Sequence, residues 1–246
     1  MRKFAPLVTL LSLSISGLAQ SSPQVVSEVN IMIPKPGMTA QFEVGRKAHS
    51  GFHGAQKDTW SVFVWEITTG ERSGAYMSAS PGHSWKDFDS REAFNKLDGV
   101  DVAKNMGPST ASGETQYYVF RDDLSLTKPT ATPAKMRTTA SYSVIPERLN
   151  DFTDAIKKIN AAIQKTNYPA KPSRWYSLAS GGSVPTFVLV TDRASWAEME
   201  PPEKKLEDAL KEAYGDASAL DQLRHSCSHI VNEMSVFRPD LSYIPK

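Results

Sequence analysis

The sequence predicts an α+β protein in which a β-α-β-β-α-β unit occurs twice in tandem. Three observations favour this fold class: strand-like and helix-like segments follow the same order in both halves, a Pro- and Thr-rich stretch separates the halves, and landmark residues recur about 110 positions later. The landmark pairs are Ile33-Pro34 with Ile145-Pro146, Trp60 with Trp175, and Trp85 with Trp196. We therefore expect two equivalent repeats at residues 25–121 and 137–240, joined by a linker at residues 122–136.

The first repeat begins with a strand-like segment at residues 25–33, which the Pro- and Gly-containing stretch at residues 34–37 ends. A helix follows, with Met38 and Phe42 at helical spacing, and we expect Gly51 to end it near Ser50. The remaining segments are a hairpin of residues 60–67 and 74–80, a second amphipathic helix carrying Trp85, Phe88, Phe94 and Leu97, and a closing strand at residues 115–120.

The second repeat opens with a strand at residues 137–145, after which Pro146 starts a helix whose apolar stripe runs from Leu149 to Ile163. Acidic residues come early in this helix and lysines late, as the helix dipole favours. The remaining segments are a hairpin of residues 175–179 and 186–191, a helical segment at residues 196–214 that Pro201-Pro202 interrupts, an added helix at residues 218–228, and a closing strand at residues 230–237.

A hairpin strand of the first repeat is apolar on both faces. The strand at residues 60–67 carries large apolar side chains on both parities, namely Trp60, Val62 and Val64 on one face and Phe63, Trp65 and Ile67 on the other. A sheet with one wetted face would alternate apolar and polar residues. Because right-handed crossovers place both helices on one face, the other face must pack against the second repeat. We expect two ferredoxin-like repeats packed sheet to sheet as an eight-stranded, pseudo-dimeric α/β barrel.

The entry into the first helix resembles that of the dimeric α/β-barrel superfamily, which includes antibiotic-biosynthesis-type monooxygenases, haem-degrading proteins and NIPSNAP-like proteins. The resemblance spans nearly all of residues 25–240, and its most specific element is Ile31-Met32-Ile33-Pro34-Lys35-Pro36-Gly37 followed by Phe42-Glu43. The second repeat departs from it, since Ile145-Pro146-Glu147-Arg148 has no glycine at the turn. The resemblance implies a fused pair of repeats that imitates the usual homodimer, and it implies no particular reaction.

The N-terminus predicts export. Arg2 and Lys3 precede an uncharged, mostly apolar run, and small residues up to Ala19 suit a cleavage site, so residues 1–19 are typical of a signal peptide. The run is too short and too rich in Ser and Thr for a membrane anchor, and no cysteine follows it for lipid attachment. We expect a mature form that is not membrane-anchored, in the periplasm or outside the cell, and a monomer because the repeats cover each other.

Charge and cysteine content exclude several kinds of partner. With 28 Lys and Arg against 27 Asp and Glu among 246 residues, the net charge of +1 gives no basic surface for nucleic acid. The single cysteine, Cys227, excludes an intramolecular disulfide and paired-thiolate metal sites. We expect Cys227 to be a small buried residue on the helix at residues 218–228.

Two pairs of histidines, His49 with His53 and His225 with His229, are four residues apart, a spacing at which two side chains on one helix can bind a metal ion. His49 and His53 share the inward side of their helix with Arg46, so they can line a pocket. No carboxylate or third ligand lies at a helpful spacing, and the predicted glycine stop falls between them, so the sequence predicts no metal site. His225 and His229 fall opposite the apolar face of their helix and are expected in solvent.

Aromatic side chains on the predicted strands offer a second kind of site. Most of them must be core, but Trp and Tyr carry polar ends, so a few can line a pocket for a flat apolar or aromatic molecule. The candidate ligand-binding residues are Arg46, His49, His53, Trp60, Tyr76, Tyr118 and Trp175. No catalytic residue is assigned, because the chain lacks the HExxH, CxxC, GxSxG, Walker and GxGxxG signatures.

These observations favour an exported small-molecule-binding or structural module without a predicted cofactor. One alternative is an enzyme resembling cofactor-independent or haem-dependent monooxygenases, in which Arg46, His49 or His53 would polarise an aromatic or apolar substrate in the barrel. A second alternative is a protein–protein interaction module that uses the Pro-interrupted segment and the added helix.

Overall fold

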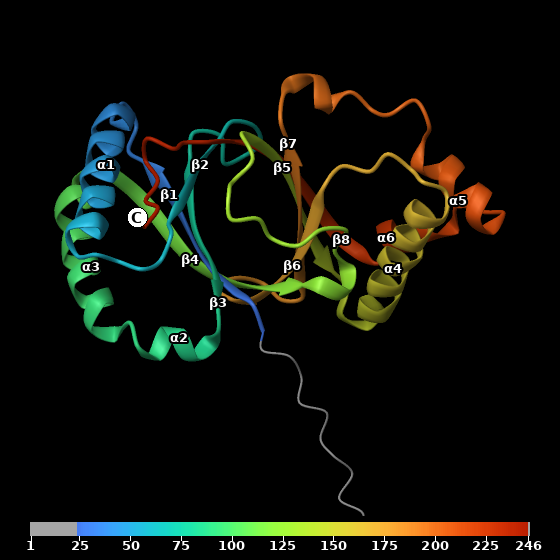
Figure 1. Cartoon of the computed structure of the whole chain (residues 1–246), viewed down its shortest axis with the longest axis horizontal. Coiled ribbons are helices and arrows are strands. Elements are labelled where there is room, and N and C mark those ends of the chain that lie inside the picture. The colour runs from blue at the N-terminus through green and yellow to red at the C-terminus, as the bar shows by residue number, and fades with distance from the viewer. Residues whose placement is uncertain (1–23, 246) are drawn as a thin grey trace, which may run out of the picture.

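The computed structural model describes residues 24–245, and the predicted signal peptide lies outside them (Figure 1). No helix among these residues has both the length and the apolar character needed to cross a bilayer. The first half contains β1 (Val26–Pro34), α1 (Thr39–Ala55), β2 (Phe63–Ile67), β3 (Tyr76–His83), α2 (Trp85–Asp89), α3 (Glu92–Asn105) and β4 (Thr110–Arg121). The second half contains β5 (Met136–Val144), α4 (Leu149–Lys165), β6 (Ser173–Ser180), β7 (Thr186–Arg193), α5 (Leu206–Tyr214), α6 (Ser218–His225) and β8 (Cys227–Phe237). Short 3₁₀ turns connect several of them.

The eight strands form one closed antiparallel barrel in the order β1-β3-β2-β8-β5-β7-β6-β4. Within each half the strands have the ferredoxin-like order, and the two four-stranded sheets join at both edges, where β2 pairs with β8 and β4 pairs with β6. The predicted α+β fold of two such units is therefore confirmed. Closure pairs every strand on both sides and removes exposed sheet edges.

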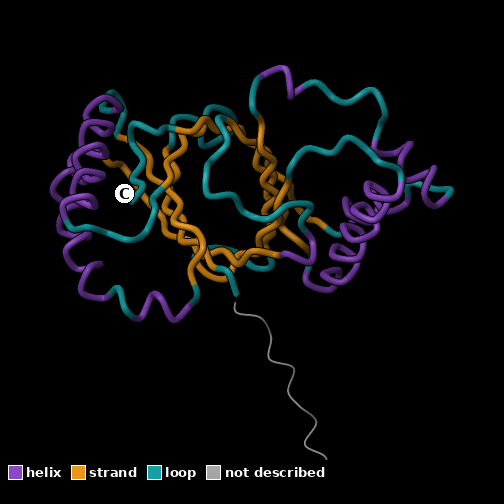
Figure 2. Tube along the Cα trace, in the orientation of Figure 1, coloured by secondary structure: helices purple, strands orange, loops and turns teal. Residues whose placement is uncertain are grey.

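Helices lie outside the barrel at opposite ends of the molecule, α1 to α3 beside the first sheet and α4 to α6 beside the second (Figures 1 and 2). Because side chains alternate along a strand, each strand sends one set inward and one set toward the helices. Trp65 of β2 points into the barrel, whereas its neighbour Val64 packs outside against Phe42 of α1. In the second half, Trp175 of β6 packs outside against Phe152 of α4.

Three helix boundaries differ from the sequence prediction. α1 continues through Gly51 and Gly54 to Ala55, because the backbone N–H of Gln56 still bonds to the carbonyl of Phe52 and neither glycine has positive φ. The second helix is split into α2 and α3 around Ser90, and Leu97 is 53% exposed rather than part of an apolar stripe. α6 ends at His225, so Cys227 begins β8.

The shorter α6 changes the surroundings of Cys227. Its thiol donates to the carbonyl of Leu223 at 3.4 Å, and the side chain is half-buried against the core beneath α4 rather than fully buried on a helix. His229 lies on β8 and His225 on α6, both exposed, so the predicted second histidine pair does not share a helical face.

The segment between the halves is not a free linker. Leu124 is fully buried in the core beneath α4, and the following loop crosses one mouth of the barrel (Figure 1, yellow-green). Pro129 and Pro133 from this loop border the barrel interior. The connection therefore covers one barrel opening as well as joining the two halves.

Candidate functional site

The barrel interior contains a partly open cavity of about 130 Å³. Inward-facing side chains of β1 to β7 line it, and the loop between β4 and β5 covers it. A cavity of about 150 Å³ in another protein accommodates benzene, so the space here suits one aromatic ring.

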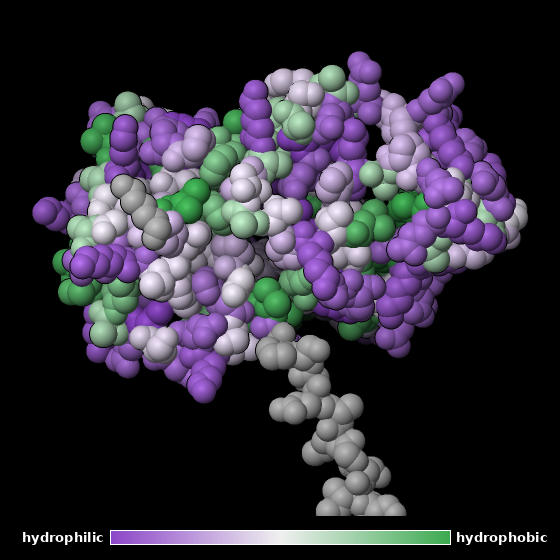
Figure 3. Space-filling view, in the orientation of Figure 1, coloured by the Kyte–Doolittle hydropathy of each residue, from purple (hydrophilic) through white to green (hydrophobic). Residues whose placement is uncertain are grey.

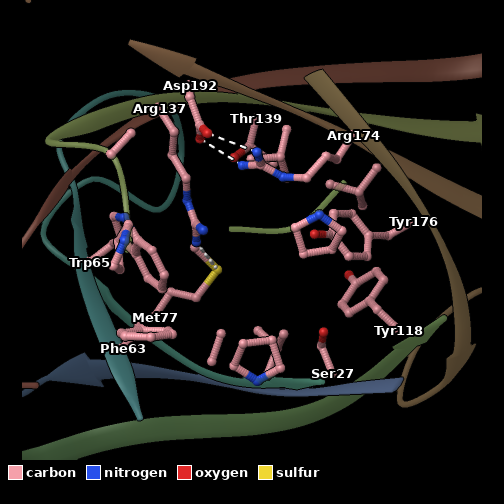
Figure 4. A pocket seen from close by; sticks show the side chains of 18 of the residues that line it. Ser27, Phe63, Trp65, Met77, Tyr118, Arg137, Thr139, Arg174, Tyr176 and Asp192 are labelled. Carbon is pink, nitrogen blue, oxygen red and sulfur yellow. Dashed lines mark hydrogen bonds and ion pairs between the residues drawn. The ribbon is translucent and has the colours of Figure 1, made fainter. Parts of the chain in front are cut away.

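Aromatic side chains form two facing walls of the cavity (Figure 4). Phe63 and Trp65 of β2 are both buried and lie on one side, and their rings meet edge to face with centroids 6.1 Å apart. Tyr118 of β4 and Tyr176 of β6 lie on the other side. Burial raises the pKa of Tyr118 to about 12 and also raises that of Tyr176, so both phenols stay protonated at neutral pH. The walls thus combine apolar faces with two hydroxyl groups.

Arg174 and Asp192 neutralise each other at the edge of the cavity. Two guanidinium nitrogens of Arg174 donate to the two carboxylate oxygens of Asp192 at 2.7 and 2.8 Å (Figure 4). Burial disfavours the charge of Arg174, but these hydrogen bonds outweigh that effect and raise its pKa. This bidentate pair fixes the geometry of both groups.

Arg137 of β5 has no such partner. No carboxylate of the described chain lies within 4.0 Å of its guanidinium, which instead lies over the Trp65 ring at 3.5 Å from the centroid. Its hydrogen bonds go to the Ser235 hydroxyl and the Met77 sulfur, both at 3.4 Å. Burial within the barrel lowers the pKa of Arg137 to about 9, so the group is still charged at neutral pH.

A third arginine completes the charge balance of the barrel interior. Arg72 borders the cavity and donates to both carboxylate oxygens of Glu233, at 2.8 and 2.5 Å. Arg174 is therefore neutralised by Asp192, and Arg72 is neutralised by Glu233, with Glu114 also 3.8 Å away. The charge of Arg137 remains, and it faces the cavity between the two aromatic walls (Figure 4).

Of the residues that the sequence predicted for ligand binding, Tyr118 lines this cavity. Tyr76 faces outward and packs on Phe42, and Trp175 lies in the core beneath α4. Trp60 lies outside the barrel, stacked on His83 with centroids 3.4 Å apart. Tyr76, Trp175 and Trp60 point away from the barrel interior because of their positions on strands and in a loop. The sequence prediction did not assign which strand face points inward.

The remaining predicted residues, Arg46, His49 and His53, come together between α1 and α3, away from the barrel interior. The Nε2 atoms of the two histidines are 3.2 Å apart, and the Asp98 carboxylate of α3 lies within 3.6 Å of both. Each Nδ1 meets another carboxylate, Asp101 for His49 at 2.7 Å and Asp58 for His53 at 2.8 Å. A third potential ligand therefore exists, from a helix distant in sequence.

Burial sets the charges of this cluster. It lowers the pKa of His49 to about 4, with Arg46 adding to the effect, and it also lowers the pKa of His53. Burial raises the pKa of Asp98 to about 6. At neutral pH both imidazoles are thus neutral and Asp98 is mainly ionised.

The chain resembles several solved structures in fold. It superposes on a structure described as an anthrone oxidase-like protein with a TM-score of 0.56 and 11% identity, covering 89% of this chain and 92% of that one. A mutant chlorite dismutase from Candidatus Nitrospira defluvii in complex with cyanide gives a TM-score of 0.57 and 9% identity over 88% and 92% of the chains. A putative monooxygenase from Lactobacillus acidophilus gives 0.54 and 6% over 90% and 97%.

No family model and no curated protein matches this sequence. At these identities the likeness establishes a fold shared with chlorite dismutase-like and monooxygenase-like structures, and the activity is a separate question. The barrel cavity does not suit a haem, because about 130 Å³ holds one ring rather than a porphyrin.

Sequence reasoning missed Arg137, Arg174 and Asp192. Arg137 begins a predicted strand, and Arg174 and Asp192 directly flank two others, all of them otherwise rich in apolar or small residues. Charges at such positions are a signal of an interior polar site. Such charges indicate a polar barrel interior. They do not predict that Asp192 pairs with Arg174 rather than with Arg137, because that choice depends on how β5, β6 and β7 align.

Proposed function

We propose that this is an exported binding protein that holds a small aromatic carboxylate, one ring with one anionic group, inside its barrel. The observation that carries the proposal is the guanidinium of Arg137, charged, inside the barrel and without a carboxylate partner among the described residues. A buried charge is strongly unfavourable unless it is compensated. An anionic ligand supplies the missing compensation.

The shape of the cavity supports the aromatic part of the proposal. Its volume of about 130 Å³ suits a single ring, and Phe63, Trp65, Tyr118 and Tyr176 offer ring faces and edges on opposite sides. Aromatic pairs in stacked or edge-to-face geometry contribute beyond their buried area. Arg137 lies between these walls, so a carboxylate on the ring can reach it while the ring contacts the aromatic side chains (Figure 4).

Titration calorimetry of the mature protein with benzoate and with benzamide at neutral pH tests the proposal. Benzamide has the same ring and nearly the same shape without the charge. We expect benzoate to bind at one site per chain and at least about tenfold more tightly, because a hydrogen bond to a charged group contributes about 1.5–3 kcal/mol.

Two variants identify the residue responsible. Arg137→Met keeps the length of the side chain and removes its charge, so benzoate should bind at least about tenfold more weakly. Arg224→Met is the matched control, since Arg224 is 65% exposed on α6. Equal affinity for benzoate and benzamide, or unchanged benzoate affinity in Arg137→Met, would refute the proposal.

A ligand that binds can also be turned over. Measuring oxygen consumption and product formation after adding hydroxylated benzoates separates a binding module from the monooxygenase-like enzyme that the fold also allows. Binding without consumption supports the binding module, and Arg137-dependent consumption supports the enzyme.

A further inference from the structure

We propose that His49, His53 and Asp98 form a binding site for a divalent transition-metal ion of the zinc class. The site lies between α1 and α3 and is independent of the barrel cavity. His49 and His53 are nearly fully buried, and Asp98 approaches them from the facing helix.

The distances between the three potential ligand atoms fit one face of a tetrahedron. The two Nε2 atoms are 3.2 Å apart, and Asp98 Oδ1 is 3.6 Å from His49 Nε2 and 3.5 Å from His53 Nε2. Bonds of about 2.0 Å at tetrahedral angles place ligand atoms about 3.3 Å apart, whereas octahedral neighbours at the same bond length are about 2.8 Å apart. The triangle is thus closest to tetrahedral coordination with the fourth position left for a water or substrate atom.

Surrounding carboxylates turn both histidines toward this point. Asp101 accepts from Nδ1 of His49 at 2.7 Å, and Asp58 accepts from Nδ1 of His53 at 2.8 Å. A neutral imidazole carries one N–H, so these bonds place it on Nδ1 and leave a lone pair on each Nε2. Carboxylates behind metal-binding histidines orient the rings and increase their basicity in the same way.

In this tautomer three acceptor atoms face one another. Asp98 Oδ1 is buried and has no hydrogen-bond partner in the described chain, and the two Nε2 atoms, 3.2 Å apart, form a hydrogen bond with each other only if one ring carries a proton on Nε2. Acceptors at this separation repel unless a proton or a metal cation lies between them. A metal ion bound to all three atoms removes that repulsion.

Neighbouring arginines do not take the place of this cation. Arg91 is committed to Asp58, with nitrogen–oxygen distances of 2.7 and 3.0 Å. Arg46 is buried with its Nε and Nη2 unpartnered, and it forms no ion pair within 4.0 Å with any described carboxylate. Two guanidiniums against three carboxylates, Asp58, Asp98 and Asp101, leave a net negative charge that favours a divalent cation.

The surroundings close one side of the site and leave another open. Tyr243 of the C-terminal segment stacks on His53 with centroids 5.4 Å apart and donates to the Asp58 carbonyl at 2.7 Å. The Asp98 side chain remains 29% exposed, which provides a route from solvent. An ion can therefore enter past Asp98 while Tyr243 holds His53 in place.

The experiment titrates Zn²⁺ and Co²⁺ into the chelator-treated mature protein, following Zn²⁺ by calorimetry and Co²⁺ by visible absorption. We expect one ion per chain and the intense absorption of tetrahedral Co²⁺. Asp98→Asn keeps the shape and removes the anionic ligand, and we expect at least about 100-fold weaker binding; Asp101→Asn removes only an orienting carboxylate and should cost about 10–100-fold.

The double variant His225→Gln/His229→Gln is the matched control, because these exposed histidines have the same sequence spacing but do not share a helix. It should bind Zn²⁺ as the parent does. Circular dichroism checks that each variant folds. The unaltered protein supplies a second test through its ¹⁵N imidazole resonances: both Nε2 signals should shift on Zn²⁺ addition, and an Nε2–H proton that persists with no Zn²⁺ uptake would overturn the proposal.

Discussion

Arg137 places a positive charge inside the barrel without a carboxylate within 4.0 Å among the described residues. Removing a charge from water costs several kcal/mol, and contact with the Trp65 ring returns only a part of it. An apolar side chain of the same length needs no such compensation. We therefore expect this residue to lower the stability of the ligand-free protein, and under the proposed function an anionic ligand compensates its charge.

This predicts opposite effects of Arg137→Met on stability and on ligand affinity. Without ligand, the free energy of unfolding should rise by about 1–3 kcal/mol, measured by urea denaturation at neutral pH. Benzoate affinity should fall, as argued above. A variant that is less stable than the parent would show that the arginine is already well compensated in the empty barrel.

His83 gives a pH-dependent contribution to stability. It stacks on Trp60 and accepts or donates a hydrogen bond with Ser80 at 3.0 Å, and the charged groups around it are Arg91, Asp87 and Asp58. Burial, reinforced by Arg91, lowers its pKa from 6.5 to about 4. The folded protein then binds fewer protons at this site than the unfolded chain between these pH values, so the contribution is present above pH 6.5 and is lost as pH falls toward 4.

We therefore expect the melting temperature to fall less between pH 6.5 and 4 in His83→Gln than in the parent protein. Thermal unfolding followed by circular dichroism measures the difference. His225→Gln, at an exposed position, should follow the parent curve. Identical slopes for His83→Gln and the parent would contradict the assignment.

At the scale of elements, the close approach of α1 and α3 depends on one glycine. A Cβ atom at Gly45 would lie 2.0 Å from the backbone oxygen of Asn105 and 2.9 Å from its carbonyl carbon. Neither atom belongs to a flexible side chain, so the helices would have to separate. The spacing of His49 and His53 from Asp98 depends on the same contact.

Gly45→Ala should lower the free energy of unfolding by about 1–3 kcal/mol, the usual cost of overpacking. Gly51→Ala in the same helix is the control: nothing lies within 4 Å of its Cβ position, and alanine should stabilise the helix by about 0.5–1 kcal/mol. Denaturant titration of both variants decides the matter. A Gly45→Ala protein as stable as Gly51→Ala would mean that α3 shifts at little cost.

Local patterns predicted most elements but not all of their ends. The helix that begins after Pro146 has a continuous apolar stripe, and α4 lies where that stripe indicates. α1 continues beyond Gly51 because a helix tolerates an exposed glycine when tertiary contacts hold the neighbouring residues, here Ser50 donating to the Leu241 carbonyl at 2.6 Å. Such contacts come from distant segments and leave no periodic signal.

At the scale of the whole molecule, the closed barrel predicts a monomer. Pairing of β2 with β8 and β4 with β6 uses the sheet edges that would otherwise join a second copy. On the face shown in Figure 3, apolar side chains form scattered patches among hydrophilic ones, a distribution typical of a surface without a large interface.

Light scattering coupled to size exclusion should therefore give the mass of one mature chain across a wide range of protein concentrations. The result should not change with benzoate, because the cavity lies within one chain. A mass of two chains would show that some surface other than the strand edges mediates association.

The sequence by itself determined the α+β class, the duplicated order of elements and the location of the connecting segment, because periodicity, turn residues and repeats are local properties. Only the tertiary structure decided which side chains meet. It places Arg137, Tyr118 and Trp65, which come from three different strands, around one cavity. It also places Asp98 of one helix beside His49 and His53 of another. Each site joins residues far apart in sequence, so its geometry depends on barrel closure and helix packing, which neither residue spacing nor hydrophobic pattern records.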